Sequence, residues 1–349
     1  MEKSNKSEIF LGLIVVFIIG ITLKLAERVI IVILLSFLLA YIMEPVISLL
    51  RKIGISLWLS VFITSILFLG IFIGFGTVIY NSISDFMISF PKYIEKLTAV
   101  MLELANRLET ASGGKFQLNV IRGLENIPVA SITFNAARSV VSYIVQFSII
   151  FLFAILFVYG KHGFQKKLMK VFLKKRGKRV PVILNRIDHE LRKYIALKTA
   201  ISLTTGIFAG IILFLFHVRF AIVIGFATFL LNYIPSIGSI IATFIPFFIA
   251  LAQFGLTAEP FWVFLSLSSV QMVIGNGIDP KLMGNTMNLS LFVVFFSLLF
   301  WGWLWGPAGI LLAVPMTTSI KIVLENIPSS SHLAVLLEPA PKTKKKKRG

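Results

Sequence analysis

Long apolar runs dominate the chain. The first covers residues 9–23, and longer runs at 29–50 and 57–80 carry few charges. A helix needs about 20 apolar residues to cross the hydrocarbon core of a bilayer, and lipid offers no hydrogen-bond partners to the backbone. These runs are apolar on every face, whereas the strands of a membrane barrel alternate. The pattern therefore predicts an all-α, polytopic membrane protein with about eight transmembrane helices.

Two polar segments, 81–138 and 161–198, have apolar residues at helical spacing between charged ones. Such a pattern is typical of an amphipathic helix. We expect the first helix on the outer membrane surface and the second at the inner headgroups, with its Lys and Arg toward anionic lipid. The apolar positions are Tyr93, Ile94, Leu97, Met101, Leu104 and Leu108 in the first segment and Ile183, Ile187, Leu191, Tyr194 and Ile195 in the second.

The charge distribution predicts the orientation. The chain has 34 Lys and Arg against 15 Asp and Glu, a net charge of +19, and a mean hydropathy of +0.92. The basic residues concentrate in 161–198 and in the tail from Lys344 to Arg348, whereas 81–138 is nearly neutral. Positive loops stay cytoplasmic, so both termini should be inside. A membrane explains this charge, and no nucleic-acid partner is expected.

These features divide the chain into six predicted parts. The parts are three transmembrane helices in 1–80, an extracytoplasmic amphipathic segment at 81–138, a transmembrane helix at 139–160, a basic cytoplasmic amphipathic segment at 161–198, a transmembrane bundle with broken helices at 199–326 and a basic cytoplasmic tail at 327–349.

Gly, Pro and Asn interrupt the apolar stretches of the C-terminal bundle at two places. The first break is NYIPSIG at 232–238, and the second is GPAG at 306–309. Pro removes a backbone donor and Gly lets backbones approach closely. Paired breaks of this kind indicate a transporter built from repeats, with its site between broken helices. We expect 220–254 and 289–324 each to form one long broken helix that crosses once. The alternatives are re-entrant hairpins or double crossings.

A polar island, GNGIDPKLMGN at 275–285, lies between the breaks. Acidic residues at membrane depth commonly mark ion or proton pathways, so Asp279 is the leading candidate, with Lys281 as the other charge of the island. The alternative is a surface loop in which Asp279 begins a turn before Pro280. Glu44 has the same two interpretations, a pathway residue or an interfacial helix end.

The residues and motifs that catalysis or ATP hydrolysis would need are absent from the sequence. The chain has no Cys and contains no GxxxxGK[ST], HExxH or GxSxG motif, so an ATP-driven pump, a metalloprotease and a serine hydrolase lose support. We therefore expect a transporter without catalytic residues, metal or cofactor, and GxxxG spacings allow a homo-oligomer. The pathway candidates are Asn232, Pro235, Gly238, Asn276, Asp279, Pro280, Lys281, Gly284, Gly306, Pro307, Pro315 and Glu44.

The run GNGIDPKLMGNTMNLSLFVVFFSLLFWGWLWGPAGILLAVPMTTSIKIVLE at 275–325, with LLNYIPSIGSIIATFIP at 230–246, resembles the AI-2E (autoinducer-2 exporter-like, UPF0118) family. The resemblance implies a multi-pass transporter of the bacterial cytoplasmic membrane with about eight helices. Some members are associated with export of autoinducer-2, and others are described as Na⁺(Li⁺)/H⁺ antiporters. The family's motifs carry over onto Asn232, Pro235, Gly238, Asp279, Pro280, Gly284, Gly306 and Pro315.

Three functions follow as hypotheses. The preferred one is efflux of a small polar solute, such as an autoinducer-2-like signal, without ATP hydrolysis. The second is Na⁺(Li⁺)/H⁺ antiport, in which Asp279 or Glu44 binds the ion. The third is a membrane scaffold that transports nothing and recruits partners or lipids through its amphipathic segments.

Overall fold

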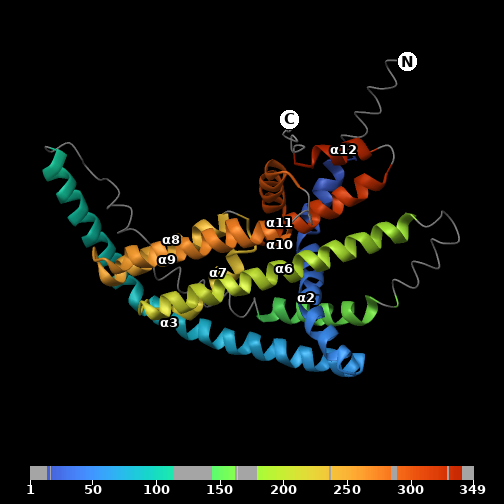
Figure 1. Cartoon of the computed structure of the whole chain (residues 1–349), viewed down its shortest axis with the longest axis horizontal. Helices are drawn as coiled ribbons and strands as arrows, with labels where there is room; N and C mark the ends of the chain where they lie inside the picture. The colour runs from blue at the N-terminus through green and yellow to red at the C-terminus, as the bar shows by residue number, and fades with distance from the viewer. Residues whose placement is uncertain are drawn as a thin grey trace, which may run out of the picture. The chain divides into compact units, whose positions relative to one another are not determined.

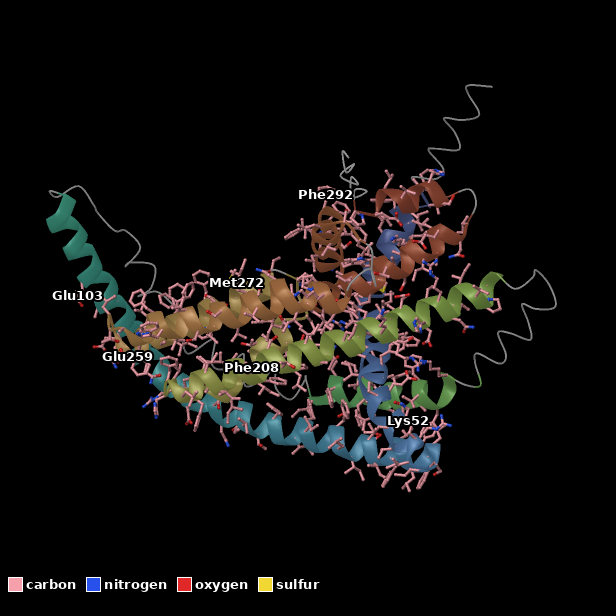
Figure 2. The ribbon with its side chains drawn as sticks, in the orientation of Figure 1. Lys52, Glu103, Phe208, Glu259, Met272 and Phe292 are labelled. Carbon is pink, nitrogen blue, oxygen red and sulfur yellow. The ribbon has the colours of Figure 1, made fainter. Side chains whose placement is uncertain are left out.

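The computed structural model describes residues 14–15, 17–112, 144–161, 163, 179–235, 237–283, 289–327 and 330–339. All regular structure in these ranges is helical, and seven of the helices are long and apolar enough to cross a membrane by length and composition. The prediction of an all-α, polytopic membrane protein is therefore confirmed. Large apolar side chains such as Phe208, Met272 and Phe292 are exposed (Figure 2), as lipid-facing residues are.

Two compact units make up the chain. Unit 1 comprises Met1–Leu57, Gln146–Ala196 and Met283–Gly349, and unit 2 comprises Trp58–Val145 and Leu197–Leu282. Each unit has a hydrophobic core of its own.

Unit 1 contains α2 (Glu27–Lys52), most of the helix at 144–161, the first part of α6 (Arg179–Leu215), α11 (Leu291–Asn326) and α12 (Ser331–Leu336). The helical residues 17–25 lead into α2 with one turn residue between them, Ala26. Backbone hydrogen bonds from Ala26 N to Thr22 O and from Ile30 N to Ala26 O continue the helical pattern there. The division of 1–80 into three crossings stays a prediction.

Helix α6 joins two segments that the sequence separates. The helix runs without interruption from the predicted amphipathic segment into the apolar run that begins at Thr199. In unit 1 its residues Tyr194 and Ile195 are buried against Leu38 and Leu312. These two side chains therefore pack on protein and not on lipid headgroups, which corrects the interfacial prediction for them.

Unit 2 contains α3 (Leu57–Ser112), the second part of α6, α7 (Ala221–Leu231), α8 (Ile237–Phe254), α9 (Glu259–Gln271), the π-helix η1 (Met272–Ile278) and α10 (Asp279–Met283) (Figure 1). Helix α3 runs through all six of the predicted apolar positions between 93 and 108, whose side chains lie outside the described part. The core of unit 2 is built around Leu213, Ala250 and Val263, which are completely buried.

Helices α7 and α8 fold back on each other as a hairpin, which we call the first hairpin. The Gln253 side chain near the end of α8 accepts a hydrogen bond from Arg219 N at 2.9 Å and donates one to His217 O at 2.8 Å, just before α7 begins. The two open ends are thus adjacent. The prediction that 220–254 is one long broken helix is wrong, because the break at 232–236 reverses the chain.

Helix α11 also folds back, at Trp305 and Gly306, whose φ/ψ angles of −130°/18° and 59°/−143° are not helical. Thr317 Oγ1 donates to Ser297 Oγ at 2.8 Å, although these residues would lie about 30 Å apart in an unbroken helix. We call 291–304 and 307–326 the second hairpin. The single-crossing prediction for 289–324 is wrong for the same reason.

The polar island is helical as far as the structure describes it. Helix α9 continues through η1 into α10, and Asp279 N bonds to Ile274 O, five residues back. Pro280, which has no N–H, follows directly. The alternative of a surface loop with a turn at Asp279 does not hold for these residues, which form a π-helix and a short α-helix, and π-helices are frequent at functional sites. Gly284 lies outside the described residues.

Candidate functional site

A buried polar stripe runs along one face of α6 in unit 2. Lys198, Ser202 and Thr205 recur at positions i, i+4 and i+7, which places them above one another on the helix. All three are buried. We call these residues the α6 stripe. Polar groups buried in an apolar bundle need partners, and the stripe finds them in two other elements.

The first partner is Asn232, at the tip of the first hairpin. Its Nδ2 donates to Ser202 Oγ at 3.2 Å and to Thr205 Oγ1 at 3.5 Å. Beside it, the Tyr233 hydroxyl shares a hydrogen bond of 2.7 Å with Thr199 Oγ1. Both tip side chains are buried. The tip is therefore held on α6 by uncharged groups that can both donate and accept.

Gly238 and Pro235 explain why the chain reverses at this point. A Cβ atom on Gly238 would collide with the carbonyl oxygen of Leu231, so that only glycine lets the start of α8 approach the end of α7. Pro235 cannot donate a backbone hydrogen bond, which ends the helical ladder. The candidate residues Asn232, Pro235 and Gly238 thus form and anchor one tip.

Asp279 is the second partner of the stripe. Its Oδ2 lies 2.7 Å from Lys198 Nζ, and the side chains are 20% and 6% exposed respectively. The predicted pathway carboxylate is therefore neutralised by a buried cation. Lys198 is one helical turn before Ser202, so the ion pair and the Asn232 contacts occupy neighbouring positions on one face of α6. The neighbouring candidates Asn276, Pro280 and Lys281 are exposed instead.

Glu44 belongs to a different cluster, in unit 1. Its carboxylate is 3.1 Å from Lys161 Nζ and 2.8 Å from Arg192 Nη1. Asp188 pairs with the same two cations, at 2.8 and 3.1 Å, and accepts a 2.6 Å hydrogen bond from Tyr41. The cluster has two negative and two positive charges and joins α2, the helix at 144–161 and α6. Its geometry is that of an ion-pair network between helices.

The candidates Gly306, Pro307 and Pro315 belong to the second hairpin. Gly306 has the positive φ of 59° that the reversal requires, and Pro307 follows it. A Cβ atom on Gly309 would collide with the carbonyl oxygen of Trp301, the same kind of close approach as in the first hairpin. Gly306 and Pro307 thus build the tip of the second hairpin, in unit 1, and Pro315 lies further along its second arm.

Sequence reasoning missed the α6 stripe. By position along the chain, Lys198 falls at the end of the basic segment, whereas Ser202 and Thr205 fall within an apolar run. The signal was present, since three polar residues at i, i+4 and i+7 in an apolar helix share one face.

Comparison with known proteins places the chain in a family. The sequence pattern of the AI-2E family of transporters matches residues 11–329. The chain belongs to this family. A "Putative transport protein" of Haemophilus influenzae is 32% identical over 342 residues, covering 95% of this chain and 97% of that protein. YhhT of Escherichia coli K12, a "Putative transport protein", is 30% identical over 94% of this chain and 93% of its own.

A third relative is similar over a part only. The "AI-2 transport protein TqsA" of Escherichia coli K12 is 44% identical over 154 residues, which is 44% of this chain and 44% of TqsA. The family resemblance predicted from the C-terminal motifs is confirmed over nearly the whole chain. The protein is thus a multi-pass membrane transporter of the AI-2E family with relatives in bacteria.

Proposed function

We propose that this transporter moves a small polar solute out of the cell, without ATP hydrolysis, through a site where the first hairpin meets the α6 stripe. The observation that carries the proposal is the buried contact of Asn232 with Ser202 and Thr205. In many transporters the solute site is formed by interrupted helices that meet inside the bundle, and the first hairpin is an interruption of this kind.

The groups at the tip suit an uncharged polar solute. Hydroxyls of Thr199, Ser202, Thr205 and Tyr233 and the amide of Asn232 can exchange their mutual hydrogen bonds for bonds to hydroxyl or carbonyl groups of a ligand. An exchange of this kind leaves no buried group unpaired. An autoinducer-2-like signal, which the name of TqsA suggests, is one candidate solute.

Cation/proton antiport is the second candidate, and the position of Asp279 favours it. A carboxylate beside the tip can bind a proton or Na⁺ once it separates from Lys198, and Asp279 is the more exposed partner of the pair. In the structure the ammonium group of Lys198 occupies the position beside Asp279 that a bound cation would take. Passage of a solute at the uncharged tip does not require Asp279 to separate from Lys198. We therefore prefer solute transport to antiport as the proposed function.

We propose a topology for the site in the bacterial cytoplasmic membrane with both termini inside. Helix α6 begins within the basic segment, which we place inside, so its end at Leu215 and the open end of the first hairpin lie outside. Helix α9 then returns, and the contact of Asp279 with Lys198 is consistent with an inner position for the island. The second hairpin would open on the inner side. Homo-oligomerisation stays a prediction.

The test is transport by purified protein in proteoliposomes against a panel of small polar solutes. We expect Asn232→Ala and Thr205→Val to lower the rate roughly tenfold, the scale of one lost buried hydrogen bond. Thr204→Val is the matched control, since Thr204 is exposed on the same helix and its hydroxyl donates to Ala200 O within α6. No transport above empty liposomes, or equal rates in all three variants, would refute the proposal.

Ion coupling is tested separately with Asp279→Asn. Under antiport, this change should alter the dependence of transport on the Na⁺ and proton gradients. Unchanged ion and pH dependence in a correctly inserted variant would exclude Asp279 as the coupling residue.

A further inference from the structure

Lys24, on the helical segment before α2, contacts the tip of the second hairpin. Its Nζ lies 2.7 Å from the carbonyl oxygen of Leu304 and 3.5 Å from that of Trp303. Both carbonyls belong to the last turn of the half-helix 291–304, directly before the break at Trp305 and Gly306. All of these residues belong to unit 1.

The break removes the normal partners of these two carbonyls. In an unbroken helix Trp303 O would accept from the N–H of residue 307, but that residue is Pro and has none. Leu304 O would accept from Ala308, which lies beyond the reversal. An unpaired carbonyl is costly in a lipid environment, and the C-terminal end of a helix carries partial negative charge. An ammonium group supplies both the hydrogen bonds and the opposite charge.

A second contact joins the same two segments. The buried indole of Trp305 donates through Nε1 to Leu23 O at 3.2 Å. Lys24 also pairs with Glu27, one turn later, at 2.9 Å. Leu23 thus offers the tip a backbone acceptor, and Lys24 offers it a cationic donor. Together the two contacts fix the position of the tip against the segment before α2.

We infer that Lys24 is a positioning residue that caps the broken half-helix and holds the tip of the second hairpin in place. The inference goes beyond the proposed function, whose site lies at the first hairpin, and assigns a role to a residue that contacts the second hairpin. Lys24 touches no solute in this role. It acts through the carbonyls of Trp303 and Leu304, whose donors four residues later are lost at Pro307 and at the reversal.

The experiment measures how accessible the tip is. The chain has no cysteine, so Ala308→Cys places a single thiol beside Pro307, and its reaction rate with N-ethylmaleimide in proteoliposomes reports on the tip. Adding Lys24→Met keeps the aliphatic stem and removes the ammonium. We expect the labelling rate to rise roughly tenfold, the scale of one lost hydrogen bond from a charged donor.

Two control variants separate the loss of the cationic donor from the loss of the ion pair with Glu27. Lys24→Arg keeps a cationic donor and should keep the slow rate, and Glu27→Gln removes only the ion pair and should leave the rate nearly unchanged. If Lys24→Met does not accumulate in the membrane, Lys24→Gln removes the charge and keeps an N–H donor, and an intermediate rate is expected. Equal rates with Lys24 and with Met or Gln at this position would overturn the inference.

The labelling readout does not depend on the solute. If Lys24→Met raises the labelling rate in a protein that moves no solute, the role of Lys24 in holding the tip is supported and the proposed function fails. If Lys24→Met leaves the labelling rate unchanged in a protein that transports, the proposed function is supported and the inference on Lys24 fails. Where transport is found, Lys24→Met should change the maximal rate more than the apparent affinity, since Lys24 lies away from the α6 stripe in the sequence and contacts a different hairpin.

Discussion

Buried side chains of the α6 stripe connect three segments of unit 2 through hydrogen bonds and one ion pair. Asn232 and Asp279 could be predicted from the sequence, because polar residues within apolar runs are costly unless they have a role. Their partners could not, since Lys198 lies 81 positions from Asp279 and only the fold brings them together. The residue type was therefore informative, while the pairing depends on how α9 returns beside α6.

The Lys198–Asp279 pair gives a prediction on stability. Asp279→Ala should leave a buried ammonium without a partner and cost about 3–5 kcal/mol, whereas replacing both members by apolar residues is often neutral. We expect Asp279→Ala to lower the melting temperature in detergent and Lys198→Met with Asp279→Leu to restore most of the loss. Equal melting temperatures for the single variant and the unchanged protein would show that the pair is not buried in solution.

Helices of this chain reverse where glycines allow two backbones to touch. The sequence located both breaks through Gly and Pro, but a kinked single helix and a hairpin use the same residues. The difference lies in contacts such as that of Gly238 with Leu231 O, which form only after the chain has turned back. Helix α6 extends through the predicted amphipathic segment for a different reason, since polar positions on one face do not end a helix that packs on protein.

Gly206 gives a sharp test of close helix packing. A Cβ atom there would lie 2.7 Å from Gly225 O and 2.8 Å from Phe229 Cβ, whereas one on Gly210 would meet its nearest neighbour, Ala221 O, at an ordinary 3.7 Å. Gly206→Ala should therefore destabilise the protein by about 1–3 kcal/mol. Gly210→Ala should be neutral or slightly stabilising. The measurement is the melting temperature of each variant in detergent. Equal values for Gly206→Ala and Gly210→Ala would contradict the close contact between α6 and α7.

The reversal of α11 can be tested in the same way. Gly309→Ala would place Cβ against Trp301 O and should disrupt the second hairpin, while Gly275→Ala meets nothing within 4 Å and is the control. We expect a loss of folded protein on size-exclusion chromatography for the first variant only. A normal profile for Gly309→Ala would favour a straight α11.

Hydropathy predicted the fold class of the whole chain correctly. The prediction that two regions each cross the membrane once was wrong. Long apolar runs were enough to predict a polytopic helical protein, because a bilayer leaves the backbone few other options. The number of crossings was harder, since a hairpin and a broken single helix have the same hydropathy. In the topology that we propose, two hairpins in place of two crossings move the polar island from the outer side to the inner side, which agrees with the preference of Lys281 for the cytoplasm.

Thiol labelling of single cysteines tests the central claim, that both interrupted regions are hairpins and that the first opens outside and the second inside. Thr257, between α8 and α9, and Asn285, at the end of the island, exchange sides between the two topologies, while Asn81 is the outer control. With an impermeant maleimide added to intact cells, the hairpin account predicts labelling of Asn81→Cys and Thr257→Cys, and of Asn285→Cys only after permeabilisation. Labelling of Asn285→Cys from outside, with Thr257→Cys protected, would contradict it.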